Sequence, residues 1–124
     1  MFTRQVLAGE PIVVYGDGEQ TRDMVYVADV AAANIAASRA SLPASQDLDG
    51  HAYNIGTGLE TSVNRLADLV SEAAGRARQT QHAPERQGDV RRSAVAPDKA
   101  VRELGWQPQT SLLEGLQLTV RSLD

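Results

Sequence analysis

Two arginines and one aspartate have the residue types and spacing that suit a phosphate-bearing ligand. Arg22 stands within residues 20–27, a run that reads as a strand and is otherwise mostly apolar. An arginine facing inward from a strand must find an anionic partner, because a buried unpaired charge is costly. The run alone leaves three options open: a bound anion, a structural pair with Asp23 or another acid, and exposure on the polar face.

The other two candidates lie in the segment Arg86-Gln87-Gly88-Asp89. A guanidinium can bind phosphate through two parallel hydrogen bonds. The Asp89 carboxylate can accept hydrogen bonds from sugar hydroxyls, and Gly88 makes the segment between the two side chains flexible. A solvated turn is the alternative, and these four residues do not decide between the two.

Residues 76–92 form a basic segment in an acidic protein. They contain five arginines and two acidic residues, a local charge of +3. The net charge of the whole chain is −4, so the residues outside this segment sum to −7. This contrast favours a local anion site, with a solvated charged loop as the alternative. The overall negative charge disfavours a general nucleic-acid binder, which needs clustered excess cations.

Other chemistries have little support in the sequence. His51 and His82 have no second ligand type at metal spacing, and no order of serine, histidine and aspartate is persuasive. The segment 56–58 (GTG) follows an expected strand, but Thr61 occupies the place of the third glycine of a dinucleotide-binding loop. A plain turn is therefore the preferred interpretation of this segment, and no catalytic constellation is identified.

The composition is that of one globular domain, residues 1–124. The chain is 42% apolar and has no cysteine, one tryptophan and one phenylalanine, so we expect a core of leucine, valine, isoleucine and alanine. No apolar run approaches the roughly 20 residues of a membrane span, and no signal peptide is recognised. We therefore expect a cytoplasmic protein without a membrane partner.

The elements that must position these residues alternate between helix and strand. We expect a hairpin of residues 12–15 and 20–27 and a helix over 30–40 with Asp29 as its N-cap. A helix capped by Ser62 is expected over 63–74, where apolar residues recur at the spacing of one buried helix face. Gly9 is expected to close a helix in a left-handed conformation. The remaining expected elements are a helical segment at 1–8, a strand at 51–55, a weak strand at 79–83 and a helix at 97–104. A last helix is expected after Ser111, which forms a capping box with Glu114.

Several segments together resemble the NAD-dependent epimerase/dehydratase family, the extended short-chain dehydrogenase/reductases, and within it the UDP-glucose 4-epimerases. The longest is residues 15–30 (YGDGEQTRDMVYVADV). The likeness continues, in order, through residues 53–58 (YNIGTG), 61–64 (TSVN), 86–91 (RQGDVR), 103–108 (ELGWQP) and 114–116 (EGL).

The resemblance implies a small mixed α/β domain, the C-terminal substrate-binding part of such an enzyme without its N-terminal Rossmann half. It implies that Arg22 and Arg86 hold the diphosphate of a nucleotide sugar, a UDP- or dTDP-sugar, and that Asp89 lies near the ribose. Met24 occupies a position that the family usually fills with phenylalanine or tyrosine, which implies a differently shaped contact with the nucleotide. Ala96 replaces a common aspartate and removes an N-cap from the helix at 97–104.

The largest departure from the family is what this sequence does not contain. It has no glycine-rich loop after a first strand, and its single lysine, Lys99, has no tyrosine four residues before it. The resemblance therefore implies that NAD belongs to the full-length family enzyme, and that this chain alone neither binds NAD nor catalyses epimerisation. The alternatives are an inactive module that acts by self-association, and the same domain of a nucleotide-sugar dehydratase or decarboxylase.

Overall fold

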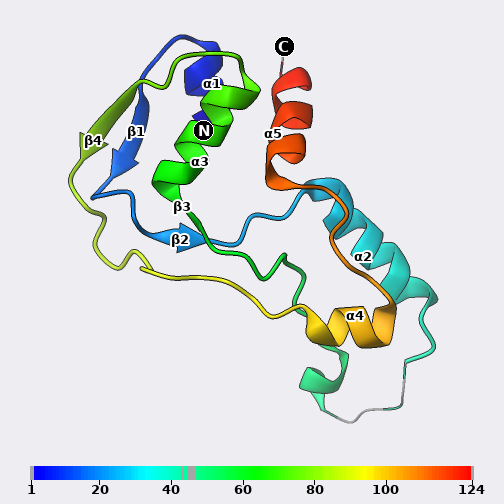
Figure 1. The fold of residues 1–124 in the computed structure, drawn as a ribbon. Coiled ribbons are helices and arrows are strands. Elements are labelled where there is room, and N and C mark those ends of the chain that lie inside the picture. The colour runs from blue at the N-terminus through cyan, green and yellow to red at the C-terminus, as the bar shows by residue number, and fades with distance from the viewer. Residues whose placement is uncertain (1, 43, 45–46, 124) are drawn as a thin grey trace.

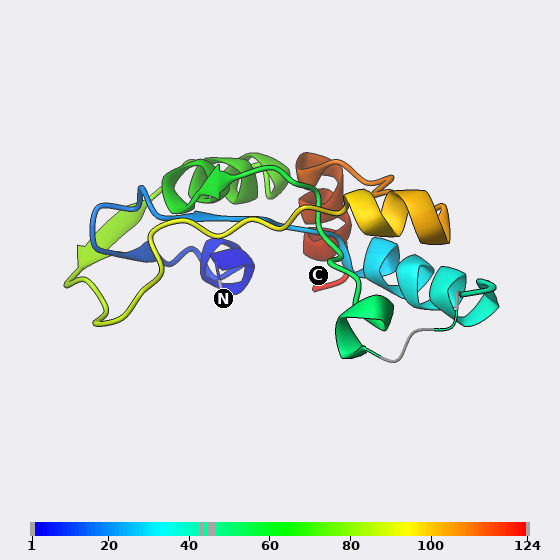
Figure 2. The same cartoon turned by 90° about the horizontal axis from the view of Figure 1, so that it is seen from below.

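The computed structural model describes residues 2–42, 44 and 47–123. The elements run in the order α1 (Phe2–Leu7), β1 (Ile12–Tyr15), β2 (Thr21–Arg22), α2 (Val27–Arg39), the 3₁₀ helix η1 (Leu48–His51), β3 (Thr61–Ser62), α3 (Val63–Ala73), β4 (Thr80–Ala83), α4 (Asp98–Leu104) and α5 (Leu112–Arg121). Two lobes lie side by side, and segments of the chain cross between them (Figures 1 and 2). The expected mixed α/β fold class is confirmed by this architecture.

The larger lobe is built from α1, α3 and α5 around the strands β1 and β4. The two strands are parallel, with Ile12 opposite Thr80 and Tyr15 opposite Ala83. Helix α3 lies on the crossover between them, as parallel strands require. The core consists of aliphatic side chains, as expected from the composition; its buried members are Val6, Ile12, Val14, Ala67 and Val70.

The smaller lobe contains η1, α2 and α4. Its buried members are Ala33, Ala100 and Trp106, so the single tryptophan joins a core that was expected to be wholly aliphatic. The indole N–H of Trp106 donates to the carbonyl oxygen of Asp29, at 2.8 Å. A buried indole needs such an acceptor, and this bond ties the segment after α4 to the first turn of α2.

Several helix boundaries agree with the expectations from the sequence. Ser62 caps α3 by accepting a hydrogen bond from the backbone N–H of Arg65, and Ser111 caps α5 in the same way through Glu114. Gly9 has a φ of 73° at the end of α1. The weakly indicated strand at 79–83 is present as β4, and the helix expected at 97–104 is α4.

The expected hairpin is wrong. β1 pairs with β4, whereas β2 pairs antiparallel with β3, Thr21 opposite Ser62 and Arg22 opposite Thr61. The short turn at 16–18 indicated a local pairing, but β1 and β2 each pair with a strand from a distant part of the chain. Tertiary pairing thus overrode the local turn signal, as strand propensity often allows.

Two other expectations about the smaller lobe are also wrong. Helix α2 begins at Val27 rather than at residue 30, and Asp29 is buried in its first turn, where its carboxylate accepts from the backbone N–H of Thr110 at 3.0 Å. Asp29 therefore anchors the segment before α5 instead of capping α2. Residues 51–55 form no strand, because no described segment pairs with them.

Candidate functional site

The candidate site lies where three segments cross between the lobes: residues 16–24, 55–62 and 84–97. Figure 1 shows the long segment between β4 and α4 passing beside β2, and the backbone N–H of Thr21 donates to the carbonyl oxygen of Arg91 at 2.9 Å. The pairing of β2 with β3 brings the third segment alongside. The crossing thus assembles residues that are far apart in the sequence.

Arg22 and Asp89 form an ion pair at the centre of this crossing. One guanidinium nitrogen of Arg22, Nη2, donates to Oδ1 of Asp89, and the other, Nη1, donates to the carbonyl oxygens of Val90 and Thr21. The two side chains are 29% and 25% exposed, so the pair lies at the surface without being fully hydrated. The charged partner of Arg22 is therefore Asp89 and not its neighbour Asp23, which was one of the options left open by the sequence.

Arg86 reaches the same network through an aromatic ring. Its guanidinium carbon lies 3.8 Å from the centre of the Tyr15 ring, a close cation–π stack. Gln20 links this stack to the ion pair, because its side-chain amide donates to the carbonyl oxygen of Tyr15 at 2.9 Å and to Oδ2 of Asp89 at 3.3 Å. The structure thus brings Arg22, Arg86 and Asp89 into one connected cluster.

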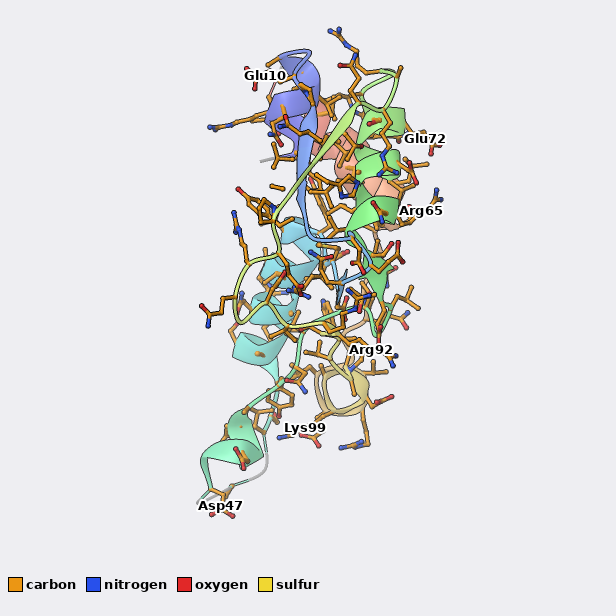
Figure 3. The ribbon with its side chains drawn as sticks, turned by 90° about the vertical axis from the view of Figure 1, so that its left-hand side faces the viewer. Glu10, Asp47, Arg65, Glu72, Arg92 and Lys99 are labelled. Atoms are coloured by element: carbon orange, nitrogen blue, oxygen red, sulfur yellow. The ribbon has the colours of Figure 1, made fainter. Side chains whose placement is uncertain are left out.

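Two more arginines connect the segment that contains Asp89 to the other two crossing segments through ion pairs. Arg91 holds both carboxylate oxygens of Asp17, at 2.8 and 3.0 Å, and Arg92 (Figure 3) holds Glu60. Hydrogen bonds from Arg91 and from the backbone N–H of Glu19 lower the pKa of the Asp17 carboxyl group. Those from Arg92 and the Thr21 hydroxyl lower the pKa of Glu60.

These pairs change the interpretation of the basic segment 76–92. Arg78, Arg91 and Arg92 pair with carboxylates that lie outside the segment, namely Asp68, Asp17 and Glu60. Much of the local positive charge is thus balanced by acidic residues from other parts of the chain. Arg86 differs from these three arginines, because its guanidinium stacks on an aromatic ring.

The segment 56–58 is more than a plain turn, because it surrounds the Asp23 carboxylate. The backbone N–H groups of Thr57 and Gly58 and the Thr57 hydroxyl all donate to it, at 2.6 to 3.0 Å. A Cβ atom on Gly56 would lie 2.6 Å from Oδ2 of Asp23 and 2.3 Å from a methyl carbon of Val95, so only glycine fits. The loop does bind an anion, but that anion is a side chain of the same protein.

Met24 lies apart from the arginine cluster, at the boundary of two adjacent hollows. The hollows have volumes of about 280 and 250 Å³ and share Met24 and residues 110–112. The first is lined mainly by the segment 24–27 and helix α5, and the second also by Leu59 and Pro108. Met24 is thus available to contact a ligand, in surroundings that are largely apolar.

Sequence reasoning missed Gln20 and Tyr15 as members of the cluster. One signal could have identified Gln20: it stands two residues before Arg22, and side chains at i and i+2 of an extended segment share a face. No comparable signal existed for Tyr15, because its stack with Arg86 depends on the parallel pairing of β1 with β4.

No helix in residues 2–42, 44 and 47–123 is long and apolar enough to cross a membrane. Within the same ranges, histidine, aspartate and glutamate side chains nowhere gather in a group of three or more that could hold a metal ion.

Comparison with known proteins places this geometry in a family context. The family described as GDP-mannose 4,6 dehydratase matches residues 1–119. A UDP-glucose 4-epimerase of Mycolicibacterium smegmatis is 41% identical over 120 residues, which are 97% of this chain and 36% of that protein. The chain therefore spans about a third of the length of this relative. Other relatives are nucleotide-sugar dehydratases and decarboxylases.

Solved structures agree with the sequence relatives. The UDP-glucose 4-epimerase of Thermotoga maritima with UDP-glucose is 42% identical and superimposes with a TM-score of 0.86, over 99% of this chain and 39% of that one. The UDP-glucose 4-epimerase of Thermus thermophilus in complex with NAD is 39% identical, with a TM-score of 0.83 over 97% of this chain and 37% of that one.

Proposed function

We propose, from the premise that this chain belongs to the GDP-mannose 4,6 dehydratase family, that it is the nucleotide-sugar-binding part of an NAD-dependent sugar 4-epimerase. Arg22 and Arg86 bind the diphosphate of a UDP- or dTDP-sugar, and Asp89 binds the ribose. The observation that carries the proposal is the cluster in which Gln20 and Asp89 connect Arg22 to the stack of Arg86 on Tyr15.

The present partners of Arg22 are ones that a diphosphate can replace. They are one carboxylate and two neutral carbonyl oxygens, whereas a diphosphate offers several charged oxygens at once. Charge-assisted, paired hydrogen bonds of guanidinium to phosphate are among the strong ones in proteins. A pair that is about a quarter exposed is also accessible to a ligand from solvent.

The stack of Arg86 on Tyr15 supports a second phosphate contact. A guanidinium that lies over a ring keeps its N–H groups in its own plane, where they remain able to donate to phosphate oxygens. The stack also restricts the side chain before the ligand arrives, which reduces the conformational entropy lost on binding.

Met24 is proposed to contact the nucleotide through the two hollows that it borders. Methionine is flexible and polarisable, so it can adapt to a base or a sugar where the family more often has an aromatic ring. Each hollow is somewhat smaller than the usual ligand pocket of about 300 Å³ or more, which suits a site that another part of the protein completes.

The chemical step is proposed for a protein that also has a dinucleotide-binding half. NAD supplies hydride transfer when it is bound there, as expected for the full-length family enzyme. The residues of this chain contribute binding and orientation, holding the nucleotide so that the sugar lies where the reaction occurs. The same binding role would serve a dehydratase or decarboxylase of the family, which is the alternative for the reaction.

The diphosphate role is tested by titrating UDP and UDP-glucose into the chain by calorimetry. We expect Arg22→Ala and Arg86→Ala each to weaken UDP binding by about tenfold or more. Arg65→Ala is the matched control, because Arg65 is an exposed arginine on α3 (Figure 3) and should leave the affinity unchanged. Unchanged binding in both site variants would remove the role, and the same substitutions in a full-length relative would extend the test to weak binding.

A second candidate function is association, and the exposed face of α2 favours it. Val27 is 71% exposed and Ile35 is 51% exposed, and the alanines between them on the same face are exposed as well. Residues 52–55, which belong to the smaller lobe, have no strand partner among the described residues. We propose that the dinucleotide-binding half covers this face, and that a second copy of the chain does so when that half is absent.

Sedimentation at several concentrations tests this second candidate. Self-association that rises with concentration, and that Ile35→Lys abolishes, is the expected result because a charge on the face opposes burial. Leu123→Lys is a suitable control, since Leu123 is also exposed but lies just beyond the end of α5. A monomer at every concentration would argue against association of the chain with itself.

A further inference from the structure

We propose that Gln20 is a positioning residue that keeps the Asp89 carboxylate in place for the ribose when Arg22 turns to the diphosphate. This inference rests on the nucleotide-sugar function proposed above and assigns a role to a residue outside the expected site. It is carried by the burial of Gln20 and by the two acceptors that its amide group serves.

Gln20 is the most buried side chain of the cluster. It is 8% exposed as a residue, whereas the side chains of Arg22 and Asp89 are 29% and 25% exposed. A buried amide is stable only when its N–H groups are satisfied. The two hydrogens of the Gln20 amide nitrogen serve the carbonyl oxygen of Tyr15 and Oδ2 of Asp89, so both are used.

The backbone around Gln20 is held as firmly as its side chain. The N–H of Val63, the first residue of α3, donates to the carbonyl oxygen of Gln20 at 3.1 Å. The next residue, Thr21, pairs with Ser62 in the short antiparallel sheet. Gln20 is therefore anchored to the larger lobe through α3 and through the end of β1.

The two carboxylate oxygens of Asp89 therefore accept hydrogen bonds from different residues. Oδ1 accepts a hydrogen bond from Arg22, which a diphosphate would bind. Oδ2 accepts one from Gln20, which makes no contact with the diphosphate in this proposal. If Arg22 were the only donor to the Asp89 carboxylate, phosphate binding would remove that hydrogen bond and leave the carboxylate without a fixed orientation for the ribose. With Gln20 in place, the carboxylate keeps its orientation and frees one oxygen for a sugar hydroxyl.

The same amide also links the two phosphate-binding arginines. Through the Tyr15 carbonyl it fixes the residue on whose ring Arg86 stacks, and through Asp89 it reaches Arg22. Loss of the Gln20 amide should nevertheless affect ribose recognition more than phosphate recognition. Each arginine attracts the phosphate through its own positive charge. The binding of ribose hydroxyls by Asp89, in contrast, depends on how hydrogen bonds orient its carboxylate.

The test compares three ligands: UDP, 2′,3′-dideoxyuridine diphosphate and inorganic pyrophosphate. Gln20→Glu keeps the shape but replaces the donor with a second carboxylate, and Gln20→Met removes the donor without adding charge. Gln117→Glu is the control, because Gln117 is exposed on α5. We expect the preference for UDP over the dideoxy ligand to fall by roughly fivefold to tenfold in both Gln20 variants. Pyrophosphate affinity should change by less than about twofold in Gln20→Met, whereas the added carboxylate of Gln20→Glu should lower it by repelling the anion.

A structural measurement keeps the inference separate from the proposed function. In NMR spectra of the unaltered chain, the side-chain amide protons of Gln20 should exchange more slowly than those of Gln117, and Asp89→Asn should speed their exchange. Fast exchange in the unaltered chain would overturn the link itself.

The ligand results are then unambiguous. If the unaltered chain binds neither UDP nor pyrophosphate, and the substitutions at Arg22 and Arg86 leave UDP binding by a full-length relative unchanged, the proposed function is contradicted and the positioning role falls with it even if the amide is protected. An unchanged preference for UDP in folded Gln20 variants overturns the positioning role alone. An equal loss of all three ligands, with a lower melting temperature, would show that Gln20 is only structural.

Discussion

The Asp23 carboxylate accepts several hydrogen bonds from the loop at 56–58. Burial raises the pKa of its carboxyl group, but the hydroxyl and backbone N–H of Thr57 and the backbone N–H groups of Gly58 and Val95 lower it by more, so that its pKa lies below the ordinary value. A carboxylate that accepts several N–H bonds is stabilised in its charged form. Asp23 thereby ties the first crossing segment to the other two.

This arrangement predicts acid sensitivity of a definite sign. Because the folded-state pKa of Asp23 is depressed, its contribution to stability is complete above the unfolded-state pKa of about 4 and is lost as the pH falls through the lower folded-state value. We expect Asp23→Asn to reduce the free energy of unfolding at pH 7 by roughly 1–3 kcal/mol and to flatten its decline below about pH 4. Urea unfolding between pH 7 and pH 2 measures both effects.

The control for this prediction is Glu72→Gln on α3. Glu72 is exposed to solvent in the last turn of that helix (Figure 3), so the substitution should leave the acid profile nearly unchanged. An Asp23→Asn protein as stable at pH 7 as the unaltered chain would show that the loop at 56–58 is held by other contacts.

At the scale of the element, α3 depends on the residue that begins it. Ser62 accepts a hydrogen bond from the Arg65 N–H at 3.1 Å, and the helix then buries Ala67, Leu69 and Val70 in the larger lobe. We expect Ser62→Ala to destabilise the protein by about 1 kcal/mol, the usual cost of losing an N-cap. Thermal and urea unfolding report the loss.

Ser38→Ala provides the comparison within a helix. The Ser38 hydroxyl donates to the carbonyl oxygen of Ile35, and such a bond inside a helix competes with regular backbone bonding rather than capping an end. The substitution should change stability by no more than about 0.5 kcal/mol. Equal effects of the two serine substitutions would contradict the capping role of Ser62.

At the scale of the whole molecule, the two lobes have unequal cores. The buried apolar residues of the smaller lobe are two alanines and Trp106, a cluster too small to hold a lobe folded without its neighbour. The expectation that residues 1–124 form one domain therefore requires the lobes to unfold together. Trp106, the single tryptophan, reports on the smaller lobe, whereas the far-ultraviolet circular dichroism is shared by helices in both.

We predict that the two signals have coincident urea midpoints, as a cooperative two-state transition requires. The coupling runs through the crossing segments, so Asp23→Asn should lower both midpoints together. A fluorescence transition that comes clearly before the change in circular dichroism would mean that the smaller lobe is a separate unit, and would contradict the single-domain expectation.

The sequence by itself determined the elements whose signals are local. The caps Ser62 and Ser111, the left-handed Gly9 and the apolar face of α3 were all predicted correctly, because capping and helix periodicity depend on residues a few positions apart. The family could also be recognised from short segments in order, and the comparisons confirm it.

Only the tertiary structure decided which distant segments meet. The pairing of β1 with β4 and of β2 with β3 depends on contacts between residues that are far apart in the chain, which turn signals cannot specify. The same contacts made Asp89 the partner of Arg22, gave Arg86 the ring of Tyr15, and placed the amide of Gln20 between them. Residue type thus indicated that an anion could be bound, whereas the crossing of the chain determined which residues form the cluster.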